Sequence, residues 1–428
     1  MCKYSQKADA RKLREIIERN RPDLKRYEDL YREFHADPEL SGQEACTASR
    51  IIAILKEHQE LEVIGNLGGH GVVGVFKNGE GPVVLLRSEL DALPLEELTG
   101  LPYASGKHMK DAHGEVVPVF HGCGHDMHMA CLLAAVEVLL KAKSAWSGTL
   151  VALFQPAEET FEGAQAMVDD NLFDKIPRPS ILLAQHSTKD KAGRLLISGG
   201  PILTACDSYD IRINGRGGHG SSPDHCLDPI ITGAHVLTRL QTIVSREISP
   251  QDFAVVTCGS FKAGHTASII PDTADLQLDL RALNERVMEK IKTAVERVVQ
   301  AECTAAGMES PPDIIHVKGA PPTINDDHAA AILTEAFRAS FGDAVLKMNP
   351  DTASEDFSLL ARPYNIPYVY WDFGTTEPQK WDEAEKHNEV DRLPGNHSSH
   401  FCPVIEPSLL TGTDAMALAA LTFLGGKA

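Results

Sequence analysis

Short apolar runs alternate with longer helical patterns over the first 200 residues. The apolar runs have the length of strands and are typical of strands buried on both faces of a sheet; they are residues 72–77, 83–88, 149–154 and 181–184. Other segments are apolar throughout or carry apolar positions at helical spacing; they are residues 24–35, 45–61 and 126–142. This alternation predicts an α/β domain built on a mixed sheet.

The pattern changes after Gly199-Gly200-Pro201. Strands that alternate apolar and polar residues are predicted there together with two helices; in chain order the elements are a strand at 208–213, a helix at 227–244, strands at 253–260 and 273–281, a helix at 287–298 and a strand at 313–317. This β-α-β-β-α-β order predicts a small α+β, ferredoxin-like domain at residues 201–319. A helix at 328–341, a strand at 368–373 and a helix at 407–424 then complete the first domain, which consists of residues 1–200 and 320–428.

The charge balance of the 428-residue chain disfavours one class of partner. Lys and Arg number 41 and Asp and Glu number 60, which gives a net charge of −19. Nonspecific binding to nucleic acid or to anionic membranes needs local positive charge, so we expect neither partner. No apolar run is long enough to cross a membrane, and residues 1–21 lack the apolar stretch of a secretory signal. The nine cysteines show no paired spacing, which predicts reduced thiols and a cytoplasmic protein.

Four segments bring metal-ligating side chains to strand ends or loops. They are His121-Gly-Cys-Gly-His125-Asp126, Gln155-Pro-Ala-Glu158-Glu159, His186 at the end of the strand at 181–184, and Asn396-His397-Ser-Ser-His400 before the last helix. Open α/β sheets place their sites at the carboxyl ends of strands. A thiolate, imidazoles and carboxylates together suit a borderline-soft cation such as zinc. The pattern predicts a metal centre in which one carboxylate of the Glu158–Glu159 pair binds metal and the other faces a water.

The same segments belong to a larger set of motifs. The set consists of Glu89-Leu-Asp91-Ala-Leu-Pro94, HGCGHDMH at 121–128, QPAEE at 155–159, GRGGHGSSP at 215–223, SEDF at 354–357 and NHSSHF at 396–401. It resembles the M20 metallopeptidase family, and most closely its amidohydrolase branch of hippurate, N-acyl-amino-acid and auxin-conjugate hydrolases. The resemblance covers nearly the whole chain. It implies a zinc-peptidase-like catalytic domain that carries an inserted lid domain.

The resemblance also implies roles for single residues. Cys123 is expected to bridge two divalent metal ions, and the other ligands expected are His125, Glu159, His186 and His397. Glu158 corresponds to the general base and Asp91 to the carboxylate that orients a ligand, while His219 of the lid corresponds to the group that stabilises the oxyanion. The ions expected are zinc or manganese, with cobalt or nickel also compatible. Two such ions polarise the amide carbonyl and activate a water.

Three positions concern substrate recognition or depart from common family patterns. Many members carry a metal-binding His where this chain has Glu89, although this branch has acidic residues there. Related hydrolases often carry Asn before the Ile-Pro of the lid, whereas this chain has Ser268, which offers no amide donor. We therefore expect Ser268 to alter substrate recognition, and we assign Glu355 of the SEDF motif to the wall of the site.

Several interpretations of single residues stay open. Cys123 is also consistent with a buried free thiol. His400 competes with His397 for the last ligand position, and the motif alignment favours His397. His121 and His128 suit packing or capping better than metal binding. The polar stretch 375–394 is either a solvated loop, which we favour, or part of the pocket rim.

The combined pattern predicts a metal-dependent amidohydrolase that cleaves an N-acyl or aminoacyl amide bond of a small molecule. A dipeptidase or exopeptidase on the same scaffold is the alternative, and Cys123 disfavours it because peptidase branches usually place Asp at that position. A ligand-binding protein without catalysis is a third hypothesis, which the intact Glu158–Glu159 pair disfavours. The sequence is compatible with a monomer or a homodimer.

Overall fold

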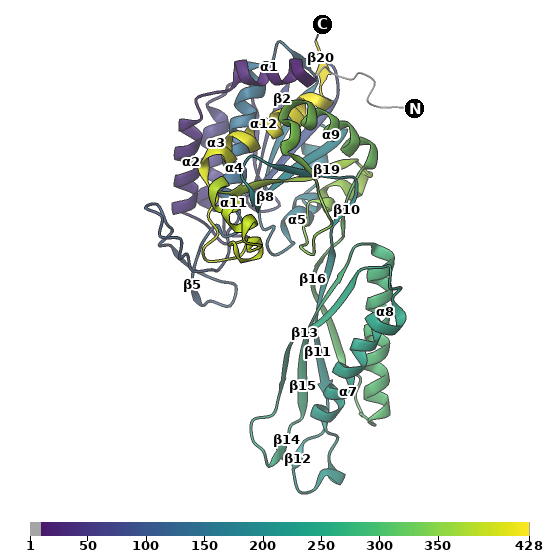
Figure 1. Ribbon diagram of the computed structural model, residues 1–428. Coiled ribbons are helices and arrows are strands. Elements are labelled where there is room, and N and C mark those ends of the chain that lie inside the picture. Colours follow the sequence, from purple (N-terminus) through teal and green to yellow (C-terminus); the bar gives the residue numbers. More distant parts are fainter. Residues whose placement is uncertain (1–9, 428) are drawn as a thin grey trace. The chain divides into compact units, whose positions relative to one another are not determined.

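The structure is a computed structural model that describes residues 10–427, and it divides into two compact units (Figure 1). Unit 1 contains the described residues up to Gly200, Ile324–Asn349 and the chain from Asp356 onwards, and unit 2 contains Pro201–Thr323 and Pro350–Glu355. The segment Pro350–Glu355, which we expected in the first domain, therefore clusters with unit 2. Part of the segment in which we expected no secretory signal, residues 1–9, lies outside the described residues. Within residues 10–427 no helix is long and apolar enough to span a membrane.

Unit 1 is built on a mixed sheet covered by helices. Among the described residues its eight strands lie in the order β1 (Glu62–Leu67), β2 (Gly71–Lys77), β7 (Thr149–Gln155), β3 (Val83–Glu89), β8 (Ile181–Lys191), β19 (Tyr368–Thr376), β9 (Leu195–Ile197) and β18 (Val345–Lys347). The larger helices are α1 (Ala10–Asn20), α2 (Lys25–Ala36), α3 (Ala45–Lys56), α4 (His125–Lys141), α9 (Asp327–Phe341), α11 (Pro378–Lys386) and α12 (Ile405–Phe423). Shorter elements are β4 (His108–Lys110), β5 (Val116–Pro118), β6 (Trp146–Ser147), α5 (Gly163–Asp169), α6 (Leu172–Lys175), α10 (Ser358–Ala361) and β20 (Gly425–Gly426).

The centre of the sheet is parallel. Strands β7, β3, β8 and β19 each run parallel to their neighbours in this group, so their carboxyl ends meet at one edge of the sheet. Glu89 at the end of β3 pairs in register with Gln155 at the end of β7. His186 of β8 pairs with Asp372 of β19. This edge is where an open α/β sheet places its site.

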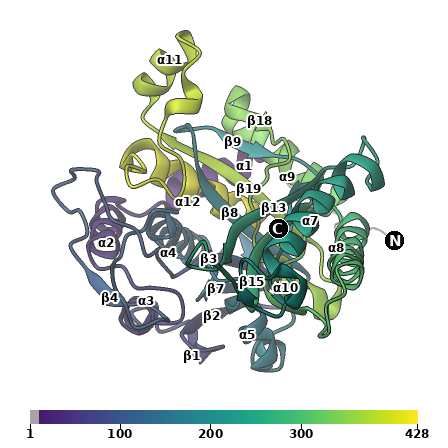
Figure 2. The ribbon, with the colours of Figure 1, turned by 90° about the horizontal axis from the view of Figure 1, so that it is seen from below.

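Helices α4 and α12 form the centre of the core of unit 1. They pack against each other, and both contact the central strands β3 and β8 (Figure 2). Nearly every residue of α4 is buried, including His125 and His128 in its first turn. A helix that is apolar on all sides is stable only when it is enclosed, so this packing holds the first turn of α4 rigidly beside the carboxyl edge of the sheet.

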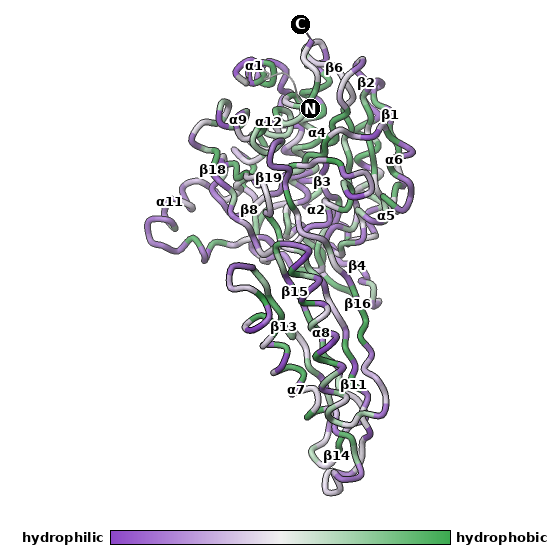
Figure 3. Tube along the Cα trace, turned by 90° about the vertical axis from the view of Figure 1, so that its right-hand side faces the viewer, coloured by the Kyte–Doolittle hydropathy of each residue, from purple (hydrophilic) through white to green (hydrophobic). Residues whose placement is uncertain are grey.

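Unit 2 has the strand order of a ferredoxin-like sandwich. Its elements follow the chain order β11 (Ala205–Asn214), α7 (Pro229–Thr242), β13 (Ala254–Ala263), β15 (Thr273–Ala282), α8 (Glu285–Ala305) and β16 (Asp313–Ala320), and the antiparallel sheet has the order β13-β15-β11-β16. Along β15 every second residue is buried. Figure 3 shows hydrophobic and hydrophilic residues interspersed along unit 2. A separate ribbon joins β12 (Gly218–His219) to β14 (Ile269–Ile270). Two further short strands, β10 (Gly200–Leu203) and β17 (Thr323–Asn325), pair where the chain passes between the units.

The predicted fold class is confirmed, and the differences concern single elements. The helix expected at 45–61 ends at Lys56, because the chain turns there to enter β1, which pairs with β2. The strand expected at 181–184 continues to Lys191, so His186 lies inside β8 and not at its end. The stretch 375–394, which we expected to be a solvated loop, contains α11. Glu377 caps this helix and Trp381 is buried beneath it, so the polar residues cover one anchored side chain.

A buried charged triad connects α2 to the first turn of α4. The Nδ1 atom of His35 lies 2.7 Å from Asp126 and its Nε2 atom lies 3.0 Å from Glu97, and the His35 side chain is fully buried. Burial opposes the charge on His35, but the hydrogen bonds to the two carboxylates raise its pKa to about 9. The protonated imidazole therefore pairs with two acidic side chains that are buried away from water.

We predict that His35→Gln lowers the free energy of unfolding by about 3 kcal/mol near pH 6.5, because it leaves two buried carboxylates without a cation. The pKa of His35 in the folded protein lies above its unfolded value of about 6.5. Its contribution is therefore complete below about pH 6.5 and is lost as the pH rises through about 9. Urea unfolding at both ends of this range checks the prediction, with exposed His113→Gln as the control. A difference between His35→Gln and wild type that does not shrink with rising pH contradicts it.

Candidate metal centre and active site

Two of the predicted ligand histidines are anchored in the same way. The Nδ1 atom of His125 donates to the backbone oxygen of Asp91 at 2.8 Å, and the Nδ1 atom of His186 donates to the backbone oxygen of Ser187 at 2.8 Å. When Nδ1 donates in this way, Nε2 of a neutral ring keeps a free lone pair. Anchoring one ring nitrogen to a carbonyl and directing the other at a cation is how proteins orient metal-binding histidines.

The five predicted ligands converge in unit 1. The ligand atoms of Cys123, His125 and Glu159 lie within 4.8 Å of one another. His186 joins this group through Nε2, which lies 3.5 Å from the Cys123 sulfur. His397 joins it from the other side, because its Nε2 atom lies 3.3 Å from Oε2 of Glu159. His397 and the competing residue His400 are both exposed, so it is the contact with Glu159, and not burial, that favours His397.

Orphaned buried atoms show that this group suits a cation. Nε2 of His125 and Oε1 of Glu159 are buried without a hydrogen-bond partner among the described residues, and they lie 3.9 Å apart. A buried polar atom without a partner is costly unless something binds it. Donor atoms that share a four-coordinate cation at 2.0–2.3 Å are separated by roughly 3.3–3.8 Å, which is close to this spacing. The donors present therefore fit a divalent metal centre.

The electrostatics of the cluster lead to the same conclusion. Burial, together with the nearby charges of Glu159 and Glu158, holds the pKa of the Cys123 thiol well above its usual range. Burial opposes the charge on His125, but the hydrogen bond to Asp91 and the charges of Glu89, Asp91 and Glu159 raise its pKa to about 10. The cluster thus carries excess negative charge, which a divalent cation would neutralise while stabilising the thiolate.

Glu158 and Asp91 lie beside the ligands. The Oε2 atom of Glu158 lies 3.8 Å from Nε2 of His125, and Glu158 is buried. Asp91 accepts the backbone N–H of Glu159 at 3.0 Å and the hydroxyl hydrogen of Ser41 at 2.7 Å, and its other oxygen lies 3.3 Å from Nδ1 of His125. Asp91 therefore contacts two of the predicted ligands, His125 and Glu159.

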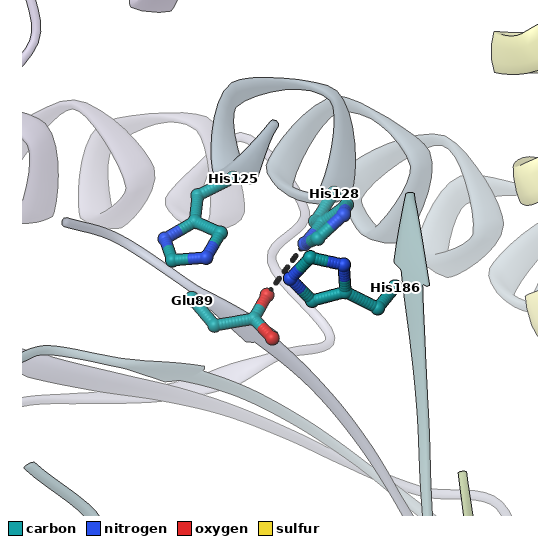
Figure 4. Close-up of side chains that lie close together, drawn as sticks. All are labelled: Glu89, His125, His128 and His186. Carbon is teal, nitrogen blue, oxygen red and sulfur yellow. Dashed lines mark hydrogen bonds and ion pairs between the residues drawn. The ribbon is translucent and has the colours of Figure 1, made fainter. Parts of the chain in front are cut away.

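A buried polar network around Glu89 and His128 lies next to the predicted ligands. Oε2 of Glu89 lies 2.7 Å from Nδ1 of His128, and Nε2 of His128 accepts the backbone N–H of Ser187 at 2.7 Å (Figure 4). The fully buried Arg87 pairs with the other oxygen of Glu89 and, at 3.3 Å, with Asp356. Burial opposes the charge on Glu89, but Arg87 and His128 hold the pKa of that carboxyl well below its usual range.

Glu89, which stands where the resemblance led us to consider a metal-binding histidine, is fully engaged in this network. Both oxygens of Glu89 have protein partners, and both ring nitrogens of His128 are in hydrogen bonds. The ligand atoms of Glu89 and His128 still lie within 4.8 Å of those of His125 and His186. Figure 4 shows the ring of His128 beside that of His186.

Backbone constraints position the two ligand loops. Gly124 has φ 85°, and a Cβ atom built on it would lie 2.3 Å from the Ser187 hydroxyl, so only glycine fits between Cys123 and His125. The backbone N–H of His397, at φ 66°, donates to the oxygen of Gly122 at 2.8 Å. The side-chain amide of Asn396 donates to the backbone oxygens of Cys123 and Ser187, which ties the two loops to β8.

The remaining predicted residues belong to unit 2. His219 is exposed, and its Nδ1 atom accepts the backbone N–H of Ser221 at 3.1 Å and lies 2.7 Å from the hydroxyl of Ser221. Ser268 is exposed too, and its backbone oxygen accepts the N–H of Gly220 at 2.8 Å. These two residues therefore share the β12–β14 ribbon. Glu355 is buried in the Pro350–Glu355 segment.

Sequence reasoning missed several supports of the ligands. Arg87 lies two residues before the quoted Glu89 motif, and Asn396 was quoted within its motif without a role, so their place next to a strand end or a predicted ligand was the available signal. Glu44 contacts the backbone of Ala157, which is 113 positions away in the chain, and no local pattern marks that contact.

Residues 85–393 match peptidase family M20/M25/M40. The chain belongs to this family. A hippurate hydrolase of Campylobacter jejuni is 36% identical over 347 residues, which cover 80% of this chain and 87% of that protein. An N-acetyl-L-cysteine deacetylase of Bacillus subtilis is 33% identical, covering 82% of this chain and 81% of that protein.

Solved structures of the M20 group share the fold. A protein of methicillin-resistant Staphylococcus aureus superposes with a TM-score of 0.82 at 27% identity, covering 97% of this chain and all of that one (100%). A dinuclear metal-binding M20 peptidase of Bacillus subtilis superposes with a TM-score of 0.73 at 24% identity, covering 94% and 99% of the two chains. The resemblance drawn from the motifs is therefore confirmed, and so is the expectation of a metal-dependent hydrolase of the M20 amidohydrolase type.

We predict that Cys123→Ala lowers the number of divalent ions retained per chain, because the thiolate lies between His186 and the His125–Glu159 group. Elemental analysis of protein equilibrated with zinc or manganese and then gel-filtered measures this number. Cys46→Ala is the matched control, since Cys46 is an exposed free cysteine outside the cluster. Equal metal content in the wild type and Cys123→Ala contradicts the ligand role.

Proposed function

We propose that this M20 protein is a two-metal amidohydrolase that cleaves an N-acyl or aminoacyl amide bond of a small molecule. The observation that carries the proposal is the convergence of Cys123, His125, Glu159, His186 and His397 with a further buried carboxylate, Glu158, beside them. The names of the relatives support this substrate class, because a hippurate hydrolase and an N-acetyl-L-cysteine deacetylase both act on N-acyl amino acids.

The five ligands would hold two divalent cations, zinc or manganese, with Cys123 shared between them. The order of contacts supports this division, because His186 meets Cys123 on one side and His397 meets Glu159 on the other. When bound, such cations polarise an amide carbonyl and lower the pKa of a nearby water. Asp91 would hold His125 and the backbone of Glu159 in place throughout.

Glu158 is assigned the role of general base, which moves a proton from the water to the leaving nitrogen. It is not needed as a ligand, because Glu159 takes that role from the next position along the chain. A carboxylate beside the ligand group can take a proton from the attacking water and later deliver it to the leaving nitrogen. The burial of Glu158 keeps bulk water from competing for that proton.

We assign His219 to stabilising the oxyanion of the intermediate. This role needs a proton on Nε2, and the hydrogen bonds of His219 favour that tautomer. Because Nδ1 accepts the N–H of Ser221, the proton of a neutral ring sits on Nε2. An exposed Nε2–H is a donor that can stabilise the negative oxygen of a tetrahedral intermediate. Ser268 and Glu355 are proposed to contribute to substrate recognition.

We predict that Glu158→Gln retains both cations but lowers kcat by several orders of magnitude, because the amide cannot accept a proton. Parallel measurements of turnover and of metal content test this directly. Turnover close to wild type removes Glu158 from the mechanism, and loss of metal together with turnover reassigns it as a ligand.

Replacing His219 by alanine tests its assignment to the oxyanion. We predict that His219→Ala lowers kcat by about 100-fold, the typical cost of one oxyanion donor, with a smaller effect on KM. His235→Ala on helix α7, an exposed histidine of the same unit, is the control. Equal values of kcat for His219→Ala and the control contradict the assignment.

The substrate class is tested by a mass-spectrometric screen of N-acetyl, N-benzoyl and longer N-acyl amino acids together with free dipeptides. The protein is supplied with zinc or manganese, and chelated protein and Glu158→Gln serve as blanks. We expect chelator-sensitive cleavage of at least one N-acyl class. Cleavage of dipeptides alone would instead make the protein a peptidase, an activity related to the thermostable carboxypeptidase 2 of Saccharolobus solfataricus, which is 31% identical over 422 residues.

A further inference from the structure

Glu44 is a buried carboxylate outside the ligand group, yet it contacts the loop that carries Glu158. Its side chain is fully buried, and its Oε1 atom accepts the backbone N–H groups of Gly42 at 2.8 Å and of Ala157 at 2.9 Å. Glu44 directly precedes helix α3 but does not cap it. Glu39 accepts the N–H groups of Cys46 and Thr47 instead, so the carboxylate of Glu44 is available for the distant loop.

The loop after β7 has a backbone that needs such support. Ala157 has φ 49° and Phe161 has φ 59°, and this left-handed region costs free energy for any residue except glycine. The loop is also tightly closed, because a Cβ atom built on Gly163 would lie 1.6 Å from the backbone oxygen of Pro156. Contacts from outside the loop must therefore stabilise this conformation, which presents Glu158 and Glu159 side by side.

Asp91 makes the matching contact on the other side of Glu158. It accepts the N–H of Glu159, while Glu44 accepts the N–H of Ala157. Two buried carboxylates therefore hold the backbone immediately before and immediately after Glu158. Ser41 completes the arrangement by donating its hydroxyl hydrogen to Asp91, so the segment 41–44 supports both contacts.

The remaining oxygen of Glu44 gives a second, independent observation. Its Oε2 atom is buried and has no hydrogen-bond partner within residues 10–427. Keeping an unpaired carboxylate oxygen away from water destabilises the fold, so stability alone does not explain a glutamate at this position. Its contact with Ala157 shows where the compensating benefit lies, because that contact fixes the loop of the assigned base.

We propose that Glu44 is a positioning residue that holds the Ala157 turn and thereby fixes where Glu158 and Glu159 point. This inference rests on the proposed function insofar as Glu158 acts as the base and Glu159 as a ligand. Glu44 itself touches neither the ligand atoms nor the reacting atoms. Its effect passes through one backbone hydrogen bond to the loop.

Two substitutions isolate that hydrogen bond. Glu44→Met keeps the length and volume of the side chain but removes the acceptor, whereas Glu44→Gln keeps an oxygen that can accept the N–H of Ala157. We expect Glu44→Met to lower kcat on N-benzoylglycine, or on the best substrate of the screen, by about 10- to 100-fold, and to weaken zinc binding by a similar factor. KM should change less than kcat, and Glu44→Gln should stay close to wild type in all three quantities.

Hydrogen exchange gives a readout that needs no substrate. Mass spectrometry of peptides covering residues 155–163 should show faster exchange in Glu44→Met than in wild type and Glu44→Gln, with exchange in α8 of unit 2 unchanged. Adding Ala157→Gly to Glu44→Met should recover part of the lost kcat, because glycine adopts the left-handed φ without strain. That partial rescue separates the positioning role from a general loss of stability.

The outcomes distinguish this inference from the proposed function. If Glu44→Met matches wild type in loop exchange and zinc affinity, or if Glu44→Gln behaves like Glu44→Met, the positioning role is wrong. If wild type cleaves no amide while the exchange and zinc results hold, the reaction is wrong but the positioning of the loop stands. If Glu44→Met fails to fold, hydrogen exchange of the wild-type protein decides the question. An unprotected backbone amide at Ala157 overturns the inference, because that amide is the one that Glu44 accepts.

Discussion

Negative charge concentrated at one buried edge of the sheet is the constraint that organises unit 1. Glu89, Asp91, Glu158 and Glu159 lie there together with the Cys123 thiol, and the first three are almost fully buried. Such a group is stable only when positive charge or hydrogen-bond donors meet each carboxylate. Arg87 and His128 serve Glu89, and backbone and hydroxyl donors serve Asp91. Nε2 of His125 and Oε1 of Glu159, which have no partner in the described part of the chain, are the atoms that a cation would join.

The fold supplies the geometry that this constraint requires. Parallel strands deliver Glu89, the loop after Gln155 and His186 to the same edge, and the enclosed helix α4 adds His125 and His128 from its first turn. Tight backbone positions keep these groups in place, as the approach of Gly124 to Ser187 shows. The triad of His35, Glu97 and Asp126 anchors the same helix turn, because Asp126 belongs to it. Stability and site geometry are therefore coupled, because a helix at the centre of the core also carries the predicted ligand His125.

The sequence contained enough information to propose the ligands and one of their supports, Asp91, but not the other supports. Cys123, His125, Glu159, His186 and His397 lie in short motifs of residues with metal-binding chemistry, and the structure brings them together. The contacts of Glu44 with Ala157 and of Arg87 with Asp356 join positions more than 100 residues apart, so they depend on tertiary packing that no local pattern reports. The expectation of a loop at 375–394 was wrong because its polar composition hid a capped helix over Trp381.

Zinc-edge X-ray absorption of the zinc-loaded protein tests the shared metal centre most directly. Combined with elemental analysis, it reports how many ions bind per chain and whether sulfur is among their neighbours. Two ions per chain with a sulfur neighbour at about 2.3 Å, lost in Cys123→Ala, is the result expected if Cys123 bridges the pair. A single ion, or a spectrum with only nitrogen and oxygen neighbours in the wild type, would contradict a cysteine-bridged two-metal site.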